Sequence, residues 1–196
     1  MKSHARVVVI GGGVVGVSTL YHLAKKGWSD VVLVERKELT SGSTWHAAGL
    51  LPLFNMSYSV GQIHKYSVKF YQELQEETGM DVGFRNVSNI RLASNQDRMD
   101  EFRQYAGVAS TIGVQVDFLT PEQVLDYWPM ANIEGLVGAI RHPQDGYIQP
   151  ADLTQALARG ARDRGAEIYR NTAVTAITRS DDGLWIVSTD KGDITC

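Results

Sequence analysis

Cysteine is nearly absent from the sequence, because Cys196 is the only one. A single cysteine excludes an internal disulfide and a metal site built from several cysteines, and it fits a reducing compartment. We therefore expect a cytoplasmic protein that holds no metal. No apolar run reaches the roughly 20 residues that a membrane-spanning helix needs. Neither sign of charge dominates, since 19 basic and 22 acidic residues give a formal charge of −3, which argues against a nucleic-acid or membrane surface.

Glycine, by contrast, is concentrated where it has a defined use. The apolar run Val7–Ile10 leads into a glycine-rich stretch that fits G-x-G-x-x-G with Gly11, Gly13 and Gly16 at the glycine positions. Gly11 permits a tight turn, Gly13 lets a pyrophosphate approach the backbone, and Gly16 lets the next helix press against the sheet. We expect the phosphates at the N-terminus of that helix, where free N–H groups and the helix dipole favour an anion.

The surrounding sequence supports this interpretation of the glycines. After Gly16 the chain has a helical apolar stripe, followed by a second apolar run, Val31–Val34, that is typical of a strand buried in a parallel sheet. Glu35 ends that strand, where a carboxylate can hydrogen-bond the ribose hydroxyls of a dinucleotide. The order of strand, glycine turn, helix, strand and acid predicts a dinucleotide site, although it does not distinguish FAD from NAD.

The stretch 40–50 is the most specific part of the sequence. It is small and rich in hydroxyl groups, and it contains two bulky side chains, Trp45 and His46. Ser43 and Thr44 could donate to phosphate oxygens, and a neutral imidazole at His46 could act as a nucleophile. The alternative is a helix start at which Ser43 or Thr44 is the cap and His46 is merely packed.

The segment 42–50, with the glycine turn and the Glu35-Arg36 pair before it, resembles the flavin-attachment region of the dimethylglycine and sarcosine dehydrogenases. These enzymes belong to the D-amino-acid-oxidase-like flavoproteins, so the resemblance favours FAD over NAD. In them the histidine at the position of His46 carries FAD covalently through the flavin 8α carbon. The FAD contacts that the resemblance implies are Val14, Val15, Glu35, Arg36, Gly42, Ser43, Thr44, Trp45, His46, Ala47, Ala48, Gly49, Leu50 and Val174.

The expected architecture is an α/β Rossmann-like FAD-binding fold of the glutathione-reductase or D-amino-acid-oxidase type, with an inserted α+β substrate domain. We expect FAD-binding parts over 1–53 and 145–196 and the inserted segment over 54–144. Within the insert, we expect a helix over 59–78 with Ile63, Tyr66, Phe70 and Leu74 on one face. A third parallel strand over 166–169 and a three-stranded meander after it should complete the nucleotide-binding part.

Six further residues attract attention without supporting a catalytic role. For His64 a boundary position on a helix is the better interpretation, and for Arg91 a salt bridge is safer than a substrate carboxylate. We assign no catalytic function to any of His64, His142, Arg85, Arg91, Tyr147 or Trp128.

The resemblance covers only the front part of a complete enzyme, so we expect a truncated chain. It implies a small-molecule amine as substrate, oxidised at an N-methyl carbon to give formaldehyde and the demethylated amine, and folate as a possible partner of a missing C-terminal domain. Two alternatives stay open. One is a glycine or D-amino-acid oxidase with dissociable FAD, and the other is a non-enzymatic regulatory protein on the same fold.

Overall fold

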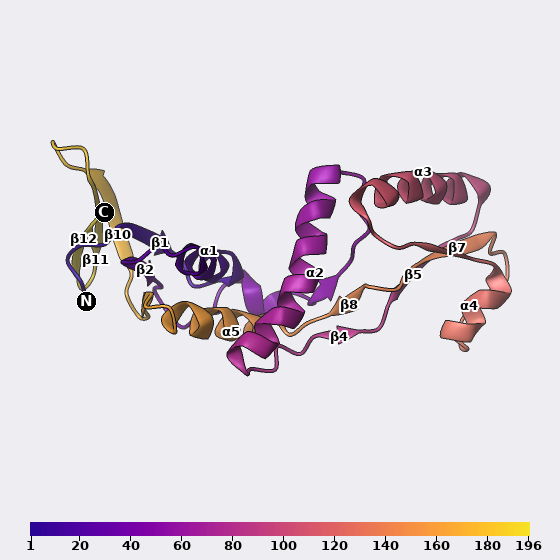
Figure 1. Ribbon diagram of the computed structural model, residues 1–196, viewed down its shortest axis with the longest axis horizontal. Helices are drawn as coiled ribbons and strands as arrows, with labels where there is room; N and C mark the ends of the chain where they lie inside the picture. Colours follow the sequence, from indigo (N-terminus) through magenta and orange to yellow (C-terminus); the bar gives the residue numbers. More distant parts are fainter. The chain divides into compact units, whose positions relative to one another are not determined.

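A computed structural model describes residues 1–196, which divide into two compact units (Figure 1). The first unit contains Met1–Ala48, Glu73–Gly83 and Gln149–Cys196, and the second contains Gly49–Gln72 and Phe84–Ile148. These bounds differ from the predicted domain ranges chiefly because the segment Glu73–Gly83, predicted within the insert, belongs to the first unit. No helix has the length and apolar character that crossing a membrane would require.

A parallel sheet forms the centre of the first unit. Its order is β1 (Val7–Ile10), β2 (Val31–Val34) and β9 (Glu167–Tyr169), and both pairs are parallel. All four residues of the central strand β2 are buried, as its apolar sequence predicts, whereas Ile10 on the edge strand β1 is 47% exposed. The order of these strands matches the first half of a doubly wound nucleotide-binding sheet, which confirms the predicted fold class.

Two helices of the first unit, α1 (Val14–Lys25) and α5 (Pro150–Arg162), lie side by side (Figure 1). The apolar residues along one face of each helix are buried. Gly160 allows the close approach, because a Cβ atom there would lie 2.7 Å from Cε2 of Tyr21. The buried residues of the two helices include Val17, Leu20, Tyr21, Ala24, Leu153, Leu157, Gly160 and Ala161.

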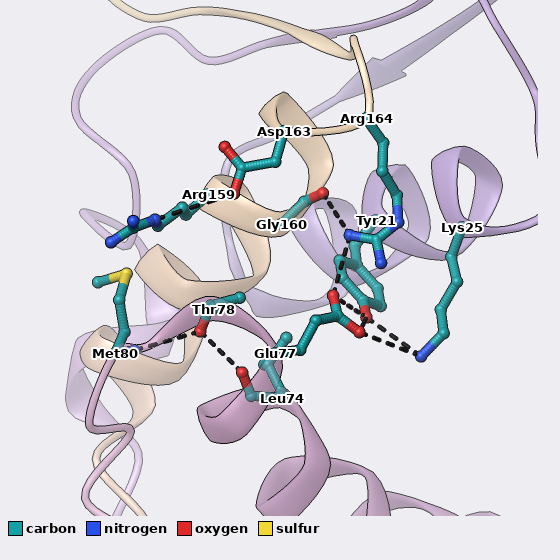
Figure 2. A network of polar contacts seen from close by, with 10 residues as sticks. All are labelled: Tyr21, Lys25, Leu74, Glu77, Thr78, Met80, Arg159, Gly160, Asp163 and Arg164. Carbon is teal, nitrogen blue, oxygen red and sulfur yellow. Dashed lines mark hydrogen bonds and ion pairs between the residues drawn. The ribbon is translucent and has the colours of Figure 1, made fainter.

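The C-terminal end of α2 (Tyr58–Thr78) is tied to α1 and α5 by a polar network (Figure 2). The Tyr21 hydroxyl lies 2.8 Å from both carboxylate oxygens of Glu77, and Arg164 forms an ion pair with the same carboxylate at 2.9 Å. Lys25 approaches it to 3.5 Å. Burial alone would raise the pKa of Glu77, but the hydrogen bonds from Tyr21 and Arg164 outweigh it and lower the pKa. Glu77 therefore holds Glu73–Gly83 within the first unit as a charged group.

The predicted meander closes the first unit. It consists of β10 (Val174–Arg179), β11 (Trp185–Thr189) and β12 (Gly192–Thr195), paired antiparallel in chain order. Ile194 packs in one cluster with Ala5, Val32 and Val34, so the meander shares a core with the parallel sheet.

The second unit is mixed α and β, as expected for the insert. Its larger sheet is antiparallel, in the order β5 (Asn89–Ala93), β7 (Gly138–His142) and β6 (Asp117–Leu119), and α3 (Gln96–Ile112) and α4 (Pro121–Tyr127) accompany it. The smaller sheet has the order β3 (Leu50–Leu51), β8 (Gly146–Tyr147) and β4 (Arg85–Asn86). The core contains Leu53, Phe102, Tyr105, Ala109 and Ile140.

The apolar face of α2 is only partly buried. Phe70 and Leu74 are enclosed, but Ile63 is 62% exposed and Tyr66 is 53% exposed. Periodicity predicts which residues share a face of a helix. It does not show how far along the helix that face has a partner.

Candidate functional site

The glycine turn between β1 and α1 has the geometry that its sequence predicts. Gly11 has φ +107°, a conformation that other residues rarely adopt, and its N–H donates to the Val34 carbonyl at 2.9 Å. A Cβ atom on Gly16 would lie 2.0 Å from the Gly11 carbonyl oxygen. Because Gly11 and Gly16 are both glycine, α1 can start immediately after the turn. The N-terminus of α1 therefore lies just beyond the carboxyl end of β1.

Thr44 completes the N-terminus of α1 from a distant part of the chain. It lies in the 3₁₀ helix η1 (Ser43–His46), and its buried Oγ1 accepts a hydrogen bond from the Val14 N–H at 3.0 Å. Because a Cβ atom on Gly13 would lie 3.1 Å from this Oγ1, the glycine makes room for the contact. The first turn of α1 carries no acidic residue, and its remaining N–H groups have no intrahelical acceptor. This end of α1 suits an anion.

Glu35 is held in place by two backbone N–H groups. Its Oε2 accepts from Gly12 at 2.7 Å, and its Oε1 accepts from Lys37 at 2.8 Å. A Cβ atom on Gly12 would lie 2.9 Å from Cγ of Glu35, so this position also favours glycine. The G-x-G-x-x-G motif leaves the position of Gly12 unspecified and therefore does not predict this requirement. Each carboxylate oxygen keeps a lone pair with which it can accept a hydrogen bond from a ligand hydroxyl.

These groups line one cavity of about 470 Å³ in the first unit. It collects residues from the glycine turn, from the end of β2 and from the segment before η1. Lys37 and Ser41 also line it and were not predicted, although both lie within the stretch between Glu35 and Gly42. The predicted residues in the lining are Gly13, Val14, Val15, Glu35, Arg36, Gly42, Ser43, Thr44 and Ala47.

A second cavity, of about 210 Å³, shares Glu35 and Arg36 with the first. It places the predicted contact Val174 together with Ile10 and Gly11 at the carboxyl ends of the parallel strands. Its unpredicted members Thr172 and Ala173 directly precede Val174 in the chain. Apolar walls beside a carboxylate that can accept hydrogen bonds from hydroxyl groups suit the flat base of a nucleotide.

Trp45 and His46 lie outside both linings. They are exposed at the end of η1, and their ring centroids are 4.0 Å apart with an interplanar angle of 37°. Ala48 also lies outside the linings, and Gly49 and Leu50 belong to the second unit. The structure thus brings together the residues expected around phosphate and ribose, while the end of the predicted segment stays apart from them.

The residues of the first unit fit the nucleotide half of FAD. The start of α1 provides N–H groups for a diphosphate, Glu35 provides a fixed acceptor for ribose hydroxyls, and the cavity at Val174 provides an apolar wall for a base. Gly13 and Gly16 occupy the positions where a side chain would fill the turn.

The second unit contains a buried polar cluster that includes His142 and Arg91, two residues to which the sequence assigns no catalytic role. His142 Nε2 lies 3.1 Å from the Tyr105 hydroxyl, and Asp145 Oδ1 accepts from the Leu53 N–H at 2.9 Å. Burial, assisted by the nearby Arg91 charge, lowers the pKa of His142 to about 4. Burial also raises the pKa of Asp145 to about 6, although the Leu53 N–H and Arg91 oppose it. These contacts favour a structural role for His142.

His64 and Arg91 also have contacts within the second unit. His64 Nδ1 lies 3.0 Å from the Pro52 carbonyl, so that nitrogen carries the proton, because a carbonyl oxygen can only accept. The Arg91 guanidinium lies 4.3 Å from the centre of the Phe54 ring. The salt bridge expected for Arg91 is therefore replaced here by a cation–π contact.

Curated proteins that are similar over nearly the whole chain include two dehydrogenases and a regulatory subunit. Human dimethylglycine dehydrogenase, a mitochondrial protein, is 43% identical over 98% of this chain, and human mitochondrial sarcosine dehydrogenase is 40% identical over 99%. The mitochondrial pyruvate dehydrogenase phosphatase regulatory subunit of mouse is 36% identical over 100%. The chain spans 22% of the length of each of these three proteins.

A solved structure and a protein-family model are also similar to this chain. The crystal structure of L-proline dehydrogenase from P. horikoshii superposes with a TM-score of 0.92 and 27% identity, covering 100% of this chain and 51% of that one. The family described as FAD dependent oxidoreductase, DAO, matches residues 6–196. The chain therefore belongs to the DAO family of FAD-dependent oxidoreductases.

Proposed function

We propose that the protein containing this chain is an FAD-dependent amine dehydrogenase or oxidase of the dimethylglycine and sarcosine dehydrogenase type. The observation that supports this proposal most is the cavity of about 470 Å³, which is lined by the start of α1, by Glu35 and by the segment before η1. His46 lies two residues after Thr44, which lines this cavity. The names of two relatives in the comparison refer to dimethylglycine and to sarcosine. The substrate is accordingly a small amino acid methylated on nitrogen.

In this proposal the residues of the first unit divide the work of holding FAD. The α1 N-terminus and Thr44 bind the diphosphate, Glu35 and Arg36 bind the adenosine ribose, and Val174 lies against the adenine. FAD held by these residues would supply the hydride acceptor for the N-methyl carbon of the amine, and hydrolysis of the substrate iminium would give formaldehyde and the demethylated amine. No residue of this chain is assigned as the catalytic base.

We further propose that His46 carries the flavin covalently. A ring nitrogen of His46 would hold the flavin through a bond to its 8α carbon, in place of one N–H and one C–H bond. The two electrons and two protons released would go to dioxygen and give hydrogen peroxide. The exposed position of His46 leaves its ring free of the protein core and accessible to a reaction partner.

The test of this function measures formaldehyde release by the full-length protein from dimethylglycine and from sarcosine, with D-alanine and glycine as competing candidates. Formaldehyde from an N-methylated amino acid supports the proposal. Oxidation of glycine or D-alanine alone would replace it with an oxidase of the glycine or D-amino-acid type. FAD binding without any amine oxidation would favour a regulatory protein, a possibility that the similarity to the mouse regulatory subunit keeps open.

The cellular location and folate binding are two further predictions for the full-length protein. The cytoplasmic location stays a prediction, and the mitochondrial names of the relatives argue against it. Folate binding by another part of the full-length protein also stays a prediction. Fractionation of the source cells, with the protein detected by antibody, would decide the compartment.

A further inference from the structure

Glu38 joins two segments of the first unit that are far apart in the sequence. Its Oε2 accepts from the Arg170 guanidinium at 2.6 Å, and its Oε1 accepts from the Asn171 side-chain amide at 3.0 Å. The hydrogen bond from Asn171 and the charge of Arg170 lower the pKa of Glu38, so its carboxylate is charged at neutral pH. Because the ion pair is more than half exposed, it adds little to the stability of the fold.

The backbones of the two segments are paired at the same place. The Asn171 N–H donates to the Lys37 carbonyl at 3.1 Å, and the Thr172 N–H donates to the Glu35 carbonyl at 2.8 Å. Asn171 has φ +51°, a left-handed conformation that asparagine adopts more readily than most residues. Asn171 therefore contacts the segment 35–38 through both its backbone and its side chain.

The segment held in this way lines the two cavities of the first unit. Arg36 belongs to the lining of both, the larger of about 470 Å³ and the smaller of about 210 Å³. It stands between Glu35 and Lys37, whose carbonyl groups accept the two backbone hydrogen bonds. The path of the backbone over 35–38 therefore determines where the Arg36 side chain begins. Glu38 lines neither cavity.

We propose that Glu38 is a positioning residue that holds Arg36 at the two cavities through its contacts with Arg170 and Asn171. This inference rests on the proposed function, in which Arg36 binds the adenosine ribose of FAD. Glu38 acts through the backbone of its own segment and does not touch the nucleotide. An exposed ion pair of this kind changes an equilibrium by a factor of up to about five.

The experiment measures the Kd for ADP, which contains the nucleotide half of FAD, in full-length protein produced without flavin. Glu38→Ala should raise this Kd about threefold to fivefold. Asn171→Gly, which permits the left-handed backbone but lacks the amide, should raise it about twofold. Asp163→Ala is the matched control, because Asp163 forms a similarly exposed ion pair with Arg159 outside both cavities. It should leave the Kd for ADP unchanged.

A double-mutant cycle with Arg36 separates positioning from general damage. Arg36→Ala should itself weaken ADP binding. When Arg36 is already alanine, adding Glu38→Ala should change the Kd for ADP by less than about 1.5-fold, because the side chain that Glu38 positions is gone. A larger change in this background, or an Arg36→Ala variant that binds ADP as tightly as the natural protein, would overturn the positioning role.

The remaining failures can be told apart. If the natural protein binds ADP and Glu38→Ala binds it with the same Kd, the inference is overturned while nucleotide binding stands. Equal losses in Glu38→Ala and Asp163→Ala also reject a specific role for Glu38. If the natural protein binds FAD but not ADP, the inference is overturned while cofactor binding stands. If it binds neither, the proposed function fails, and the inference fails with it.

Discussion

Thr44 is the residue that joins the segment after β2 to the first turn of α1, through its Oγ1 and the Val14 N–H. Thr44→Val keeps the size of the side chain and removes the acceptor. We expect it to lower the free energy of unfolding by about 1–2 kcal/mol, as loss of a helix-capping contact does, and to weaken FAD binding severalfold. Urea unfolding and FAD titration measure the two effects.

The neighbouring hydroxyl provides the control for Thr44. Ser43 lines the same cavity but is exposed. Ser43→Ala should change the free energy of unfolding by no more than about 0.5 kcal/mol. If Thr44→Val unfolds at the same urea concentration as Ser43→Ala, the Thr44 contact is not significant for stability.

Asp145 should give the second unit a pH-dependent stability. Its pKa rises from the ordinary 3.8 to about 6 in the folded protein. The folded state therefore binds the proton more tightly than the unfolded state does. As the pH rises from about 4 to about 6, Asp145 lowers the free energy of unfolding by a growing amount. Asp145→Asn removes that cost while keeping an oxygen for the Leu53 N–H. Across this pH range, the free energy of unfolding of the variant should rise relative to that of the natural protein by up to about 3 kcal/mol.

Urea unfolding of both proteins at several pH values tests this difference. His142, whose pKa falls from 6.5 to about 4, has the opposite effect, because stability is lost as the pH falls through that interval. Both proteins contain His142, so subtraction of the two curves leaves the effect of Asp145. A difference that does not vary between about pH 4 and pH 7 would show that Asp145 is not held in its neutral form.

Among the elements, the pair α1 and α5 depends on a glycine in the middle of a helix. Gly160→Ala improves helix propensity but puts a Cβ atom 2.7 Å from Cε2 of Tyr21. We expect the clash to prevail and to lower the free energy of unfolding by about 1–3 kcal/mol. Thermal or urea unfolding measures it.

A glycine in α3 shows what the same substitution does in open space. No heavy atom lies within 4 Å of a Cβ atom built on Gly107, which is exposed. Gly107→Ala should therefore raise the free energy of unfolding by up to about 1 kcal/mol. If both variants are stabilised, the contact between α1 and α5 can relax without cost.

The sequence predicted most elements because their signals are local. The run Val31–Val34 is a buried strand as its composition indicated. Likewise, α4 starts with a capping threonine, Thr120, followed by Pro121, which is a local signal for the start of a helix. The exposure of Ile63 and Tyr66 could not be predicted, because burial of a helix face depends on what packs on it, which periodicity does not contain. Likewise, the hydrogen bond between Gly12 and Glu35 joins residues 23 positions apart, and no local pattern specifies it.

At the scale of the molecule, short motifs were enough to recognise membership of the DAO family. They were not enough to predict which segments belong to each of the two compact units. Glu73–Gly83 belongs to the first unit through the contacts of Glu77 with Tyr21 and Arg164, which come from two other parts of the chain. The candidate site was predictable at the glycine turn, Glu35 and Thr44, because each has a defined position in a nucleotide-binding fold. The contribution of Lys37 and Ser41 depends on the path of the chain between Glu35 and η1.

The most direct test of the proposed function asks whether flavin stays with His46 after denaturation. The full-length protein is precipitated in acid, washed and digested, and the peptide that contains His46 is examined for flavin fluorescence and for a matching increase in mass. We predict that both are found, that His46→Ala abolishes them, and that the exposed His4→Ala leaves them unchanged. Flavin that washes away from the natural protein would contradict covalent attachment at His46.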